Sequence, residues 1–183
     1  MNTAHALAKV VASFFRKQRQ AHSQTGRSRF LSTTGMFAAE LEPVLSQCYL
    51  AGLKVLRAPN ATVDVAVAAA KIHAQELARQ LNESTGNMLA EDKPLGDVFG
   101  TDRAANIGMQ EDKVALERCK GLVAKHRGKR LKWVVDGKPC KMCKRLGGRI
   151  RKPGQSFGND LQGNPILQAP SHVNCKCRLV LVD

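Results

Sequence analysis

Two short clusters in the last third of the chain have the residue types and spacing of a metal site. Cys140 and Cys143 form a Cys-x-x-Cys motif, and His172, Cys175 and Cys177 follow after 28 intervening residues. Thiolate and imidazole are ligands that suit a tetrahedral Zn²⁺. The two-residue gap lets one tight turn direct both sulfurs at a single ion. We expect Cys140, Cys143, His172 and Cys175 to bind Zn²⁺, with Cys177 as the alternative ligand for one position.

The same cysteines have two other interpretations. A disulfide is one, but residues 1–15 lack the features of a secretory signal, so we expect a reducing compartment that favours metal binding. Redox catalysis is the other, but no thioredoxin-like strand–helix–strand pattern surrounds the Cys-x-x-Cys. Protein ligands would fill every position on the metal, and no Glu stands beside a ligand as general base. We therefore expect a structural zinc site without catalytic activity.

The positive charge of the chain is concentrated near this motif. The net charge is +14, and residues 113–152 carry fifteen Lys/Arg against two Asp/Glu. Residues 1–30 are also basic, whereas residues 40–112 carry eleven Asp/Glu against six Lys/Arg. Blocks of one sign are typical of proteins that contact a polyanion or an acidic protein surface, although a solvated face is the simpler alternative. The residues expected to contact phosphates are Lys129, Arg130, Lys132, Lys144, Arg145, Arg149 and Arg151.

The elements that must position these residues are mostly helices. Aromatic residues are only 4% of the chain, and Ala, Leu and Val supply most apolar positions, which favours helices over sheets. Apolar periodicity predicts helices over residues 3–20, 36–57, 63–83 and about 101–125, with 21–34 and 84–97 as loops. Strands are predicted over residues 131–135, 149–151 and 177–182, with 152–171 as a loop. We expect a mainly α fold with a small α+β C-terminal module, in which a short antiparallel sheet stapled by zinc follows a helical N-terminal two-thirds.

Three parts are expected along the chain: a basic amphipathic helix with a linker (1–34), a helical region (35–97) and a module (98–183) whose residues 131–183 hold the zinc. The first helix is predicted either to bind a membrane or partner or to pack Phe14 and Phe15 into a core. No run approaches the length of a membrane span. Cys48 and Cys119 stand alone in helical patterns and are predicted to be small buried residues.

An ordered set of residues in the C-terminal module resembles a known pattern. The set is Trp133, Asp136, Cys140-x-x-Cys143, Leu146-Gly147, Phe157, Pro170 and His172-x-Asn174-Cys175-x-Cys177-Arg178 before a final apolar strand. It is similar to the C-terminal zinc module of the phage minor head protein family, the Mu-F-like head morphogenesis proteins. The resemblance covers residues 98–183. Val173, Lys176 and Gly147 depart from the family pattern at positions that are not ligands.

The resemblance implies a virion protein, made in the host cytoplasm and located inside the capsid head. Such a protein would associate with the portal protein or the major capsid protein and act in head assembly or in DNA packaging and delivery. Packaged DNA would meet the basic blocks through its phosphates. The alternative is a stand-alone, zinc-stabilised nucleic-acid-binding regulatory protein. We do not expect an enzyme, because His5, His22, His73 and His126 are scattered and no paired carboxylates stand near the cysteines.

Overall fold

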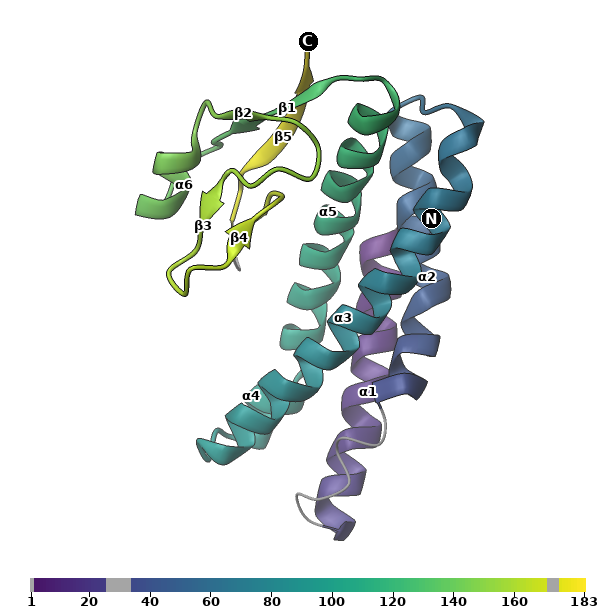
Figure 1. Cartoon of the computed structure of the whole chain (residues 1–183). Coiled ribbons are helices and arrows are strands. Elements are labelled where there is room, and N and C mark those ends of the chain that lie inside the picture. The colour runs from purple at the N-terminus through teal and green to yellow at the C-terminus, as the bar shows by residue number, and fades with distance from the viewer. Residues whose placement is uncertain (1, 26–33, 171–174) are drawn as a thin grey trace. The chain divides into compact units, whose positions relative to one another are not determined.

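The computed structural model describes residues 2–25, 34–170 and 175–183 (Figure 1). As predicted, the N-terminal two-thirds is mainly helical and a small antiparallel sheet follows. The helices are α1 (Thr3–Thr25), α2 (Thr34–Val55), the 3₁₀ turn η2 (Asn60–Thr62), α3 (Val63–Ala90), α4 (Leu95–Phe99), α5 (Thr101–His126) and α6 (Lys141–Leu146). The strands are β1 (Arg130–Val134), β2 (Ile150–Arg151), β3 (Gly158–Asn159), β4 (Pro165–Ile166) and β5 (Arg178–Val182).

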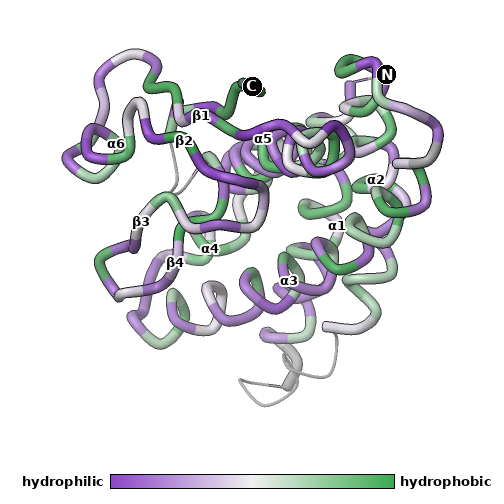
Figure 2. Tube along the Cα trace, turned by 45° about the horizontal axis from the view of Figure 1, so that its top comes forward, coloured by the Kyte–Doolittle hydropathy of each residue, from purple (hydrophilic) through white to green (hydrophobic). Residues whose placement is uncertain are grey.

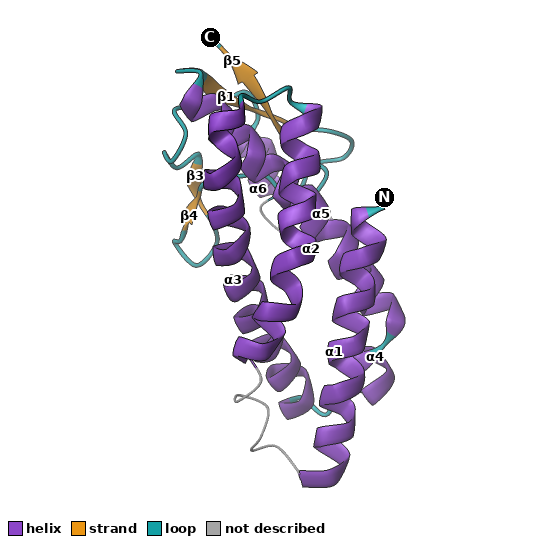
Figure 3. Cartoon of the chain, turned by 90° about the vertical axis from the view of Figure 1, so that its right-hand side faces the viewer, coloured by secondary structure: helices purple, strands orange, loops and turns teal. Residues whose placement is uncertain are grey.

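The described chain divides into two compact units. Unit 1 comprises residues 1–48 and 67–112, and unit 2 comprises residues 49–66 and 113–183. Helices α2, α3 and α5 each contribute residues to both units. Figure 3 shows the strands only in the C-terminal part of the chain, whereas helices form the rest. None of the helices in the described ranges is both long enough and apolar enough to cross a membrane.

Aromatic packing along α1 forms the centre of unit 1. The Phe14 and Phe37 rings stack with their centroids 3.6 Å apart. Phe15 is fully buried, and the Arg103 guanidinium lies 4.6 Å from its ring centroid, a cation–π contact. Of the two roles predicted for this helix, the structure supports core packing through both phenylalanines.

The prediction of a loop over residues 84–97 was wrong in two places, because α3 continues to Ala90 and α4 occupies Leu95–Phe99. The polar residues of this stretch are used inside the unit. Thr85 is fully buried, and Arg103 donates hydrogen bonds to the hydroxyls of Thr85 (3.1 Å) and Ser84 (3.0 Å). Tertiary contacts thus keep a polar segment helical, which local propensity does not predict.

A close approach of two helix backbones fixes α1 against α5 inside unit 1. A Cβ built on Gly108 would lie 2.5 Å from the Ala4 carbonyl oxygen and 2.7 Å from the Ala8 nitrogen. Only glycine leaves room for backbones at this separation. Gly108 is therefore a packing residue rather than a flexible point in α5.

The sheet of unit 2 has the strand order β2-β1-β5, and both pairings are antiparallel. Along β1 the alternate residues Leu131 and Trp133 are buried, whereas Arg130 and Lys132 are exposed. One face of the sheet therefore packs on the core and the other carries charge. The core consists of Ala124, Leu131, Trp133, Cys143, Leu146, Phe157, Ile166, Ala169, Cys175, Cys177 and Leu179.

Within the segment predicted as a loop, β3 and β4 form a two-stranded ribbon. Its turn is closed by the Asp160 carboxylate, which accepts hydrogen bonds from the main-chain N–H groups of Gln162 (2.9 Å) and Asn164 (2.8 Å). Phe157, just before β3, packs its ring against Trp133 with centroids 5.3 Å apart. The ribbon thus continues from a residue of the unit 2 core.

Candidate metal centre

Three cysteine thiols meet in the core of unit 2. The Sγ atoms of Cys143, Cys175 and Cys177 all lie within 4.8 Å of one another. Cys143 Sγ and Cys175 Sγ are 3.6 Å apart. A tetrahedral ion with metal–sulfur bonds of about 2.3 Å holds its sulfurs about 3.8 Å apart. The three sulfurs are therefore close enough together to share one metal ion, and the cysteines form no disulfide.

Cys140 completes the set as the residue that caps α6. Its backbone is extended (φ −68°, ψ 165°), and its Sγ accepts a hydrogen bond from the Cys143 main-chain N–H at 3.4 Å. All four cysteines line one cavity of about 370 Å³, together with Asp136, Gly137, Lys138, Pro139 and Lys176. Cys140 is exposed, whereas the other three are buried, so it lies on the solvent side of the cluster.

Helix α6 was not predicted, because Cys-Lys-Met-Cys was interpreted as a turn. A helix does follow the motif, as in redox proteins that carry Cys-x-x-Cys. The surrounding topology differs from theirs, however, because β1 and β2 on either side of α6 pair antiparallel rather than parallel. Strands β1 and β2 therefore form a hairpin, and Cys140 and Cys143 lie in the segment that connects them.

The second cluster contributes two cysteines from the segment that leads into β5. Cys175 was predicted as a ligand and Cys177 as the alternative, and both are buried in the core next to Cys143. His172 lies outside the described residues. Cys143, Cys175 and Cys177, with Cys140 nearby, form a cluster that can bind a metal ion.

Burial favours the protonated form of two of these thiols, Cys143 and Cys177, because it raises their pKa values. It raises the pKa of Cys143 well above its ordinary value, and hydrogen bonds with the neighbouring thiols raise it further. Burial also raises the pKa of Cys177, while contacts with Cys143 and Trp133 act in the opposite direction. A bound cation would displace these protons, because the thiolate is the ligand.

Two polar side chains of helix α5 contact the segment that carries the second pair of cysteines. Lys113 Nζ donates to the Cys175 carbonyl at 2.8 Å, which places a positive charge beside the thiols. Glu117, only 2% exposed, accepts a hydrogen bond from the Leu179 N–H at 2.6 Å and pairs with Lys120 at 2.6 Å. These contacts hold the strand that follows Cys177. Sequence reasoning missed both residues, since their partners lie about 62 positions away.

The seven residues predicted to contact phosphates fall into two groups. Four of them bond to other parts of the unit: Lys129 to the Asp183 carboxylate, Arg130 to the Asp183 main chain, Arg149 to the Phe157 carbonyl and Arg151 to the Ser156 carbonyl. The other three, Lys132, Lys144 and Arg145, are exposed, and their side chains have no ion-pair or hydrogen-bond partner among the described residues. Figure 2 shows hydrophilic residues along β2 and α6, where several of these side chains originate.

The remaining two cysteines are buried, as predicted. Cys48 and Cys119 are buried, and Cys119 Sγ donates a hydrogen bond to the Tyr49 carbonyl at 3.3 Å. Burial raises the pKa of each thiol to about 12. His73 is likewise buried, and its Nε2 lies 2.7 Å from Glu111 Oε2, so it is a satisfied core histidine.

Comparison of the chain with models of protein families, with curated proteins and with solved structures gives no match. The function must therefore be argued from the cysteine cluster, the charge around it and the order of its motifs.

Proposed function

We propose that this chain is a structural DNA-contacting protein whose C-terminal module is held together by one Zn²⁺. More specifically, we propose a minor head protein of a tailed phage, located inside the capsid head. The observation that carries the proposal is the meeting of Cys143, Cys175 and Cys177 sulfurs at metal-binding separation inside a strongly basic module.

Zinc is the metal that best suits this donor set. Four thiolates in a tetrahedral arrangement are typical of structural zinc, and Cys140, Cys143, Cys175 and Cys177 provide them. With four protein ligands, no position remains for a substrate or an activated water. The proposed site is therefore structural, and we propose no enzymatic activity for the chain.

The zinc proposal is tested on the full chain purified without chelator. Native mass spectrometry is expected to give one Zn²⁺ per chain. Trp133, the only Trp, is fully buried beside the cluster, so its fluorescence reports the state of the metal module. Chelation is expected to shift Trp133 emission to longer wavelength while most of the helical circular dichroism remains. A chain that binds no zinc and keeps the same Trp133 emission in chelator would refute the metal site.

Single substitutions decide which residues are ligands. Cys177→Ser is expected to lose zinc as fully as Cys143→Ser, because both sulfurs belong to the buried cluster. His172→Ala then serves as the matched comparison, since the sequence alone had favoured His172 over Cys177. Retention of zinc in Cys177→Ser together with its loss in His172→Ala would show that His172, and not Cys177, is the fourth zinc ligand.

The basic residues around the zinc module support contact with DNA phosphates. Residues 113–152 carry an excess of thirteen positive charges, and Lys132, Lys144 and Arg145 are exposed without a partner in the described chain. Binding is expected to be independent of base sequence and to weaken steeply with salt, because released counterions drive it. Replacing these three residues by Gln is expected to lower the slope of log K against log salt by about 3. An unchanged slope in a filter-binding series would remove them from the interface.

The minor head role rests on the order of the motifs. Trp133, Asp136, the two cysteine pairs and Phe157 stand in the sequence order of the Mu-F-like head morphogenesis proteins. The proposed partners are the portal protein or the major capsid protein, together with packaged DNA. The test is mass spectrometry of purified virions from the phage that encodes the chain, followed by infection with virions whose chain carries Cys143→Ser. Presence in the head and a loss of infectivity are expected.

A stand-alone zinc-stabilised regulatory protein is the second candidate. It is favoured only by the combination of a metal site with basic charge, and it predicts tight binding to one base sequence. Absence of the chain from virions together with sequence-specific binding would put this candidate first.

A further inference from the structure

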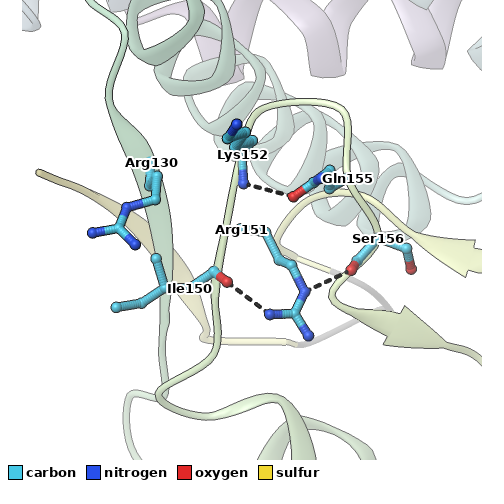
Figure 4. Close-up of a pocket in the computed structure, with 6 residues that line it drawn as sticks. All are labelled: Arg130, Ile150, Arg151, Lys152, Gln155 and Ser156. Carbon is cyan, nitrogen blue, oxygen red and sulfur yellow. Dashed lines mark hydrogen bonds between the residues drawn. The ribbon is translucent and has the colours of Figure 1, made fainter.

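A second pocket lies at the outer edge of the three-stranded sheet in unit 2. It has a volume of about 550 Å³ and is lined by Arg130, Ile150, Arg151, Lys152, Gln155 and Ser156 (Figure 4). Three of these six residues are cations and none is acidic. A lining of this kind repels metal ions and attracts oxyanions.

The strand pairing brings two of the cations together. Leu131 pairs with Arg151 and Lys132 pairs with Ile150, so one step further along the strands Lys152 stands across from Arg130. Like charges in opposite positions of an antiparallel pair repel each other. Lys152 is exposed, and its ammonium group has no partner in the part of the chain that the structure describes. Arg130 already donates to the Asp183 main chain, so Lys152 is the cation of this pair that remains for an anion.

Arg151 is held in place without losing its charge. Its Nε donates to the Ser156 carbonyl at 3.1 Å, and one terminal nitrogen donates to the Ile150 carbonyl at 2.8 Å. Figure 4 shows the guanidinium fixed between these two main-chain oxygens. Both acceptors are neutral, and three of the five guanidinium N–H donors remain for a ligand. The side chain is thus preorganised for an oxyanion.

Gln155 adds a neutral donor to the same pocket. Its Oε1 accepts a hydrogen bond from the Lys152 main-chain N–H at 3.2 Å, which turns the amide so that its NH₂ group is left to donate. The Ser156 hydroxyl is not available, because it donates to the Gly158 carbonyl at 2.5 Å. The side-chain groups of the pocket that remain for a ligand are therefore the N–H donors of Arg151, Lys152 and Gln155.

We propose that this pocket binds a phosphate group of a nucleic-acid backbone and anchors the basic module on DNA. The proposal rests on the proposed function, which it deepens by naming the phosphate site. A nucleic acid is favoured over an acidic protein because the free cations Lys132, Lys144 and Arg145 belong to the same dense basic block. A nucleic-acid backbone carries regularly spaced phosphates, so it can contact several separate cations of one basic module.

The test compares two lysines of equal charge and different position. Lys152→Gln removes the unpartnered cation of the pocket, and Lys125→Gln removes an exposed lysine near the end of α5 that does not line the pocket. Binding of the zinc-loaded full chain to a short DNA duplex is followed by fluorescence anisotropy over a series of salt concentrations. Lys152→Gln is expected to bind about tenfold more weakly at low salt, with a salt slope smaller by about 1. Lys125→Gln is expected to change affinity less than twofold.

The outcomes separate this proposal from the function on which it rests. Equal weakening by the two substitutions, with the wild-type chain still binding DNA, would overturn the pocket and leave the proposed function intact. No binding by the wild-type chain would overturn both. Poly-glutamate that competes as well as DNA at equal charge would overturn the nucleic-acid occupant in favour of an acidic protein.

A second measurement covers the case in which a substitution alters the fold. Inorganic phosphate is titrated into the wild-type chain while the Arg151 Nε–Hε resonance is followed by NMR. A saturable shift that sodium chloride at equal ionic strength does not produce is expected. An Arg151 resonance that responds equally to both salts would overturn the pocket as a phosphate site.

Discussion

The backbone contact at Gly108 leads to a prediction whose sign the structure fixes. In Gly108→Ala the new Cβ would lie 2.5 Å from the Ala4 oxygen, 2.7 Å from the Ala8 nitrogen and 2.9 Å from the Ala8 Cβ. The first two are backbone atoms, which cannot rotate away, so α1 must shift as a whole. Overpacking of this kind costs about 1–3 kcal/mol. The gain in helix propensity from Gly to Ala offsets about 0.5–1 kcal/mol.

The net loss expected for Gly108→Ala is therefore about 1–2 kcal/mol in the free energy of unfolding, or about 3–6 °C in melting temperature for a chain of this size. Gly86→Ala is the matched control, because Gly86 also lies in a helix of unit 1 and its added Cβ meets nothing within 4 Å. This control is expected to gain about 0.5–1 kcal/mol. Both are measured by urea unfolding followed through helical circular dichroism. A Gly108→Ala variant as stable as Gly86→Ala would refute the close contact of α1 and α5.

Three further predictions concern ionisable and thiol groups. Burial raises the pKa of Glu117 above its usual range, so the stability it contributes is present below its unfolded pKa and is lost as pH rises through its folded pKa. Urea unfolding between pH 4 and pH 8 is expected to show Glu117→Gln gaining stability relative to wild type as pH rises, and parallel profiles would contradict this. Cys48 and Cys119, with pKa values raised to about 12, are expected to resist alkylation at pH 8 in the folded chain, where about one thiol in ten thousand is ionised. Peptide mapping checks this, and rapid modification of either cysteine before unfolding would count against their burial. Cys140, the exposed member of its cluster, is expected to be alkylated first in a chelator that removes any bound metal, and the same mapping would refute its solvent-side position if Cys143 reacted earlier.

The long periodic segments of this chain were predictable, and the short ones were not. Helices over residues 63–83 and 101–125 follow from apolar spacing, and so do strands around Trp133 and Leu179. Helix α6 was missed because Cys140 caps it with a sulfur instead of the oxygen of a Ser or Asp that usually marks a helix start. Strands β3 and β4 were missed because two-residue strands that contain Gly158 and Pro165 show no alternation.

Part of the candidate metal site was likewise predictable from the sequence, and part was not. Spacing alone brought Cys140, Cys143 and Cys175 together, because a Cys-x-x-Cys motif constrains its own geometry. The place of Cys177 in the cluster depends on how the chain enters β5, which no local pattern reports. The bonds of Arg149 and Arg151 to main-chain carbonyls also could not be predicted, because they depend on where the segment after β2 folds back. The sequence predicted where positive charge is concentrated, but it did not predict which basic side chains are already bonded within the protein and which remain to bind a ligand.

The cysteine cluster joins two points of the chain that are 32 residues apart, and β2, β3 and β4 all lie between them. A metal bound by both cysteine pairs would cross-link these two points and close the chain between them into a loop. The entropy of closing such a loop grows only with the logarithm of its length, by about 0.6 kcal/mol for each doubling. The turn between β3 and β4 can therefore lengthen or shorten in related chains at little thermodynamic cost, provided that the cysteines of the cluster and the Trp133–Phe157 contact are kept. Variation in length should thus be concentrated at the tip of this ribbon.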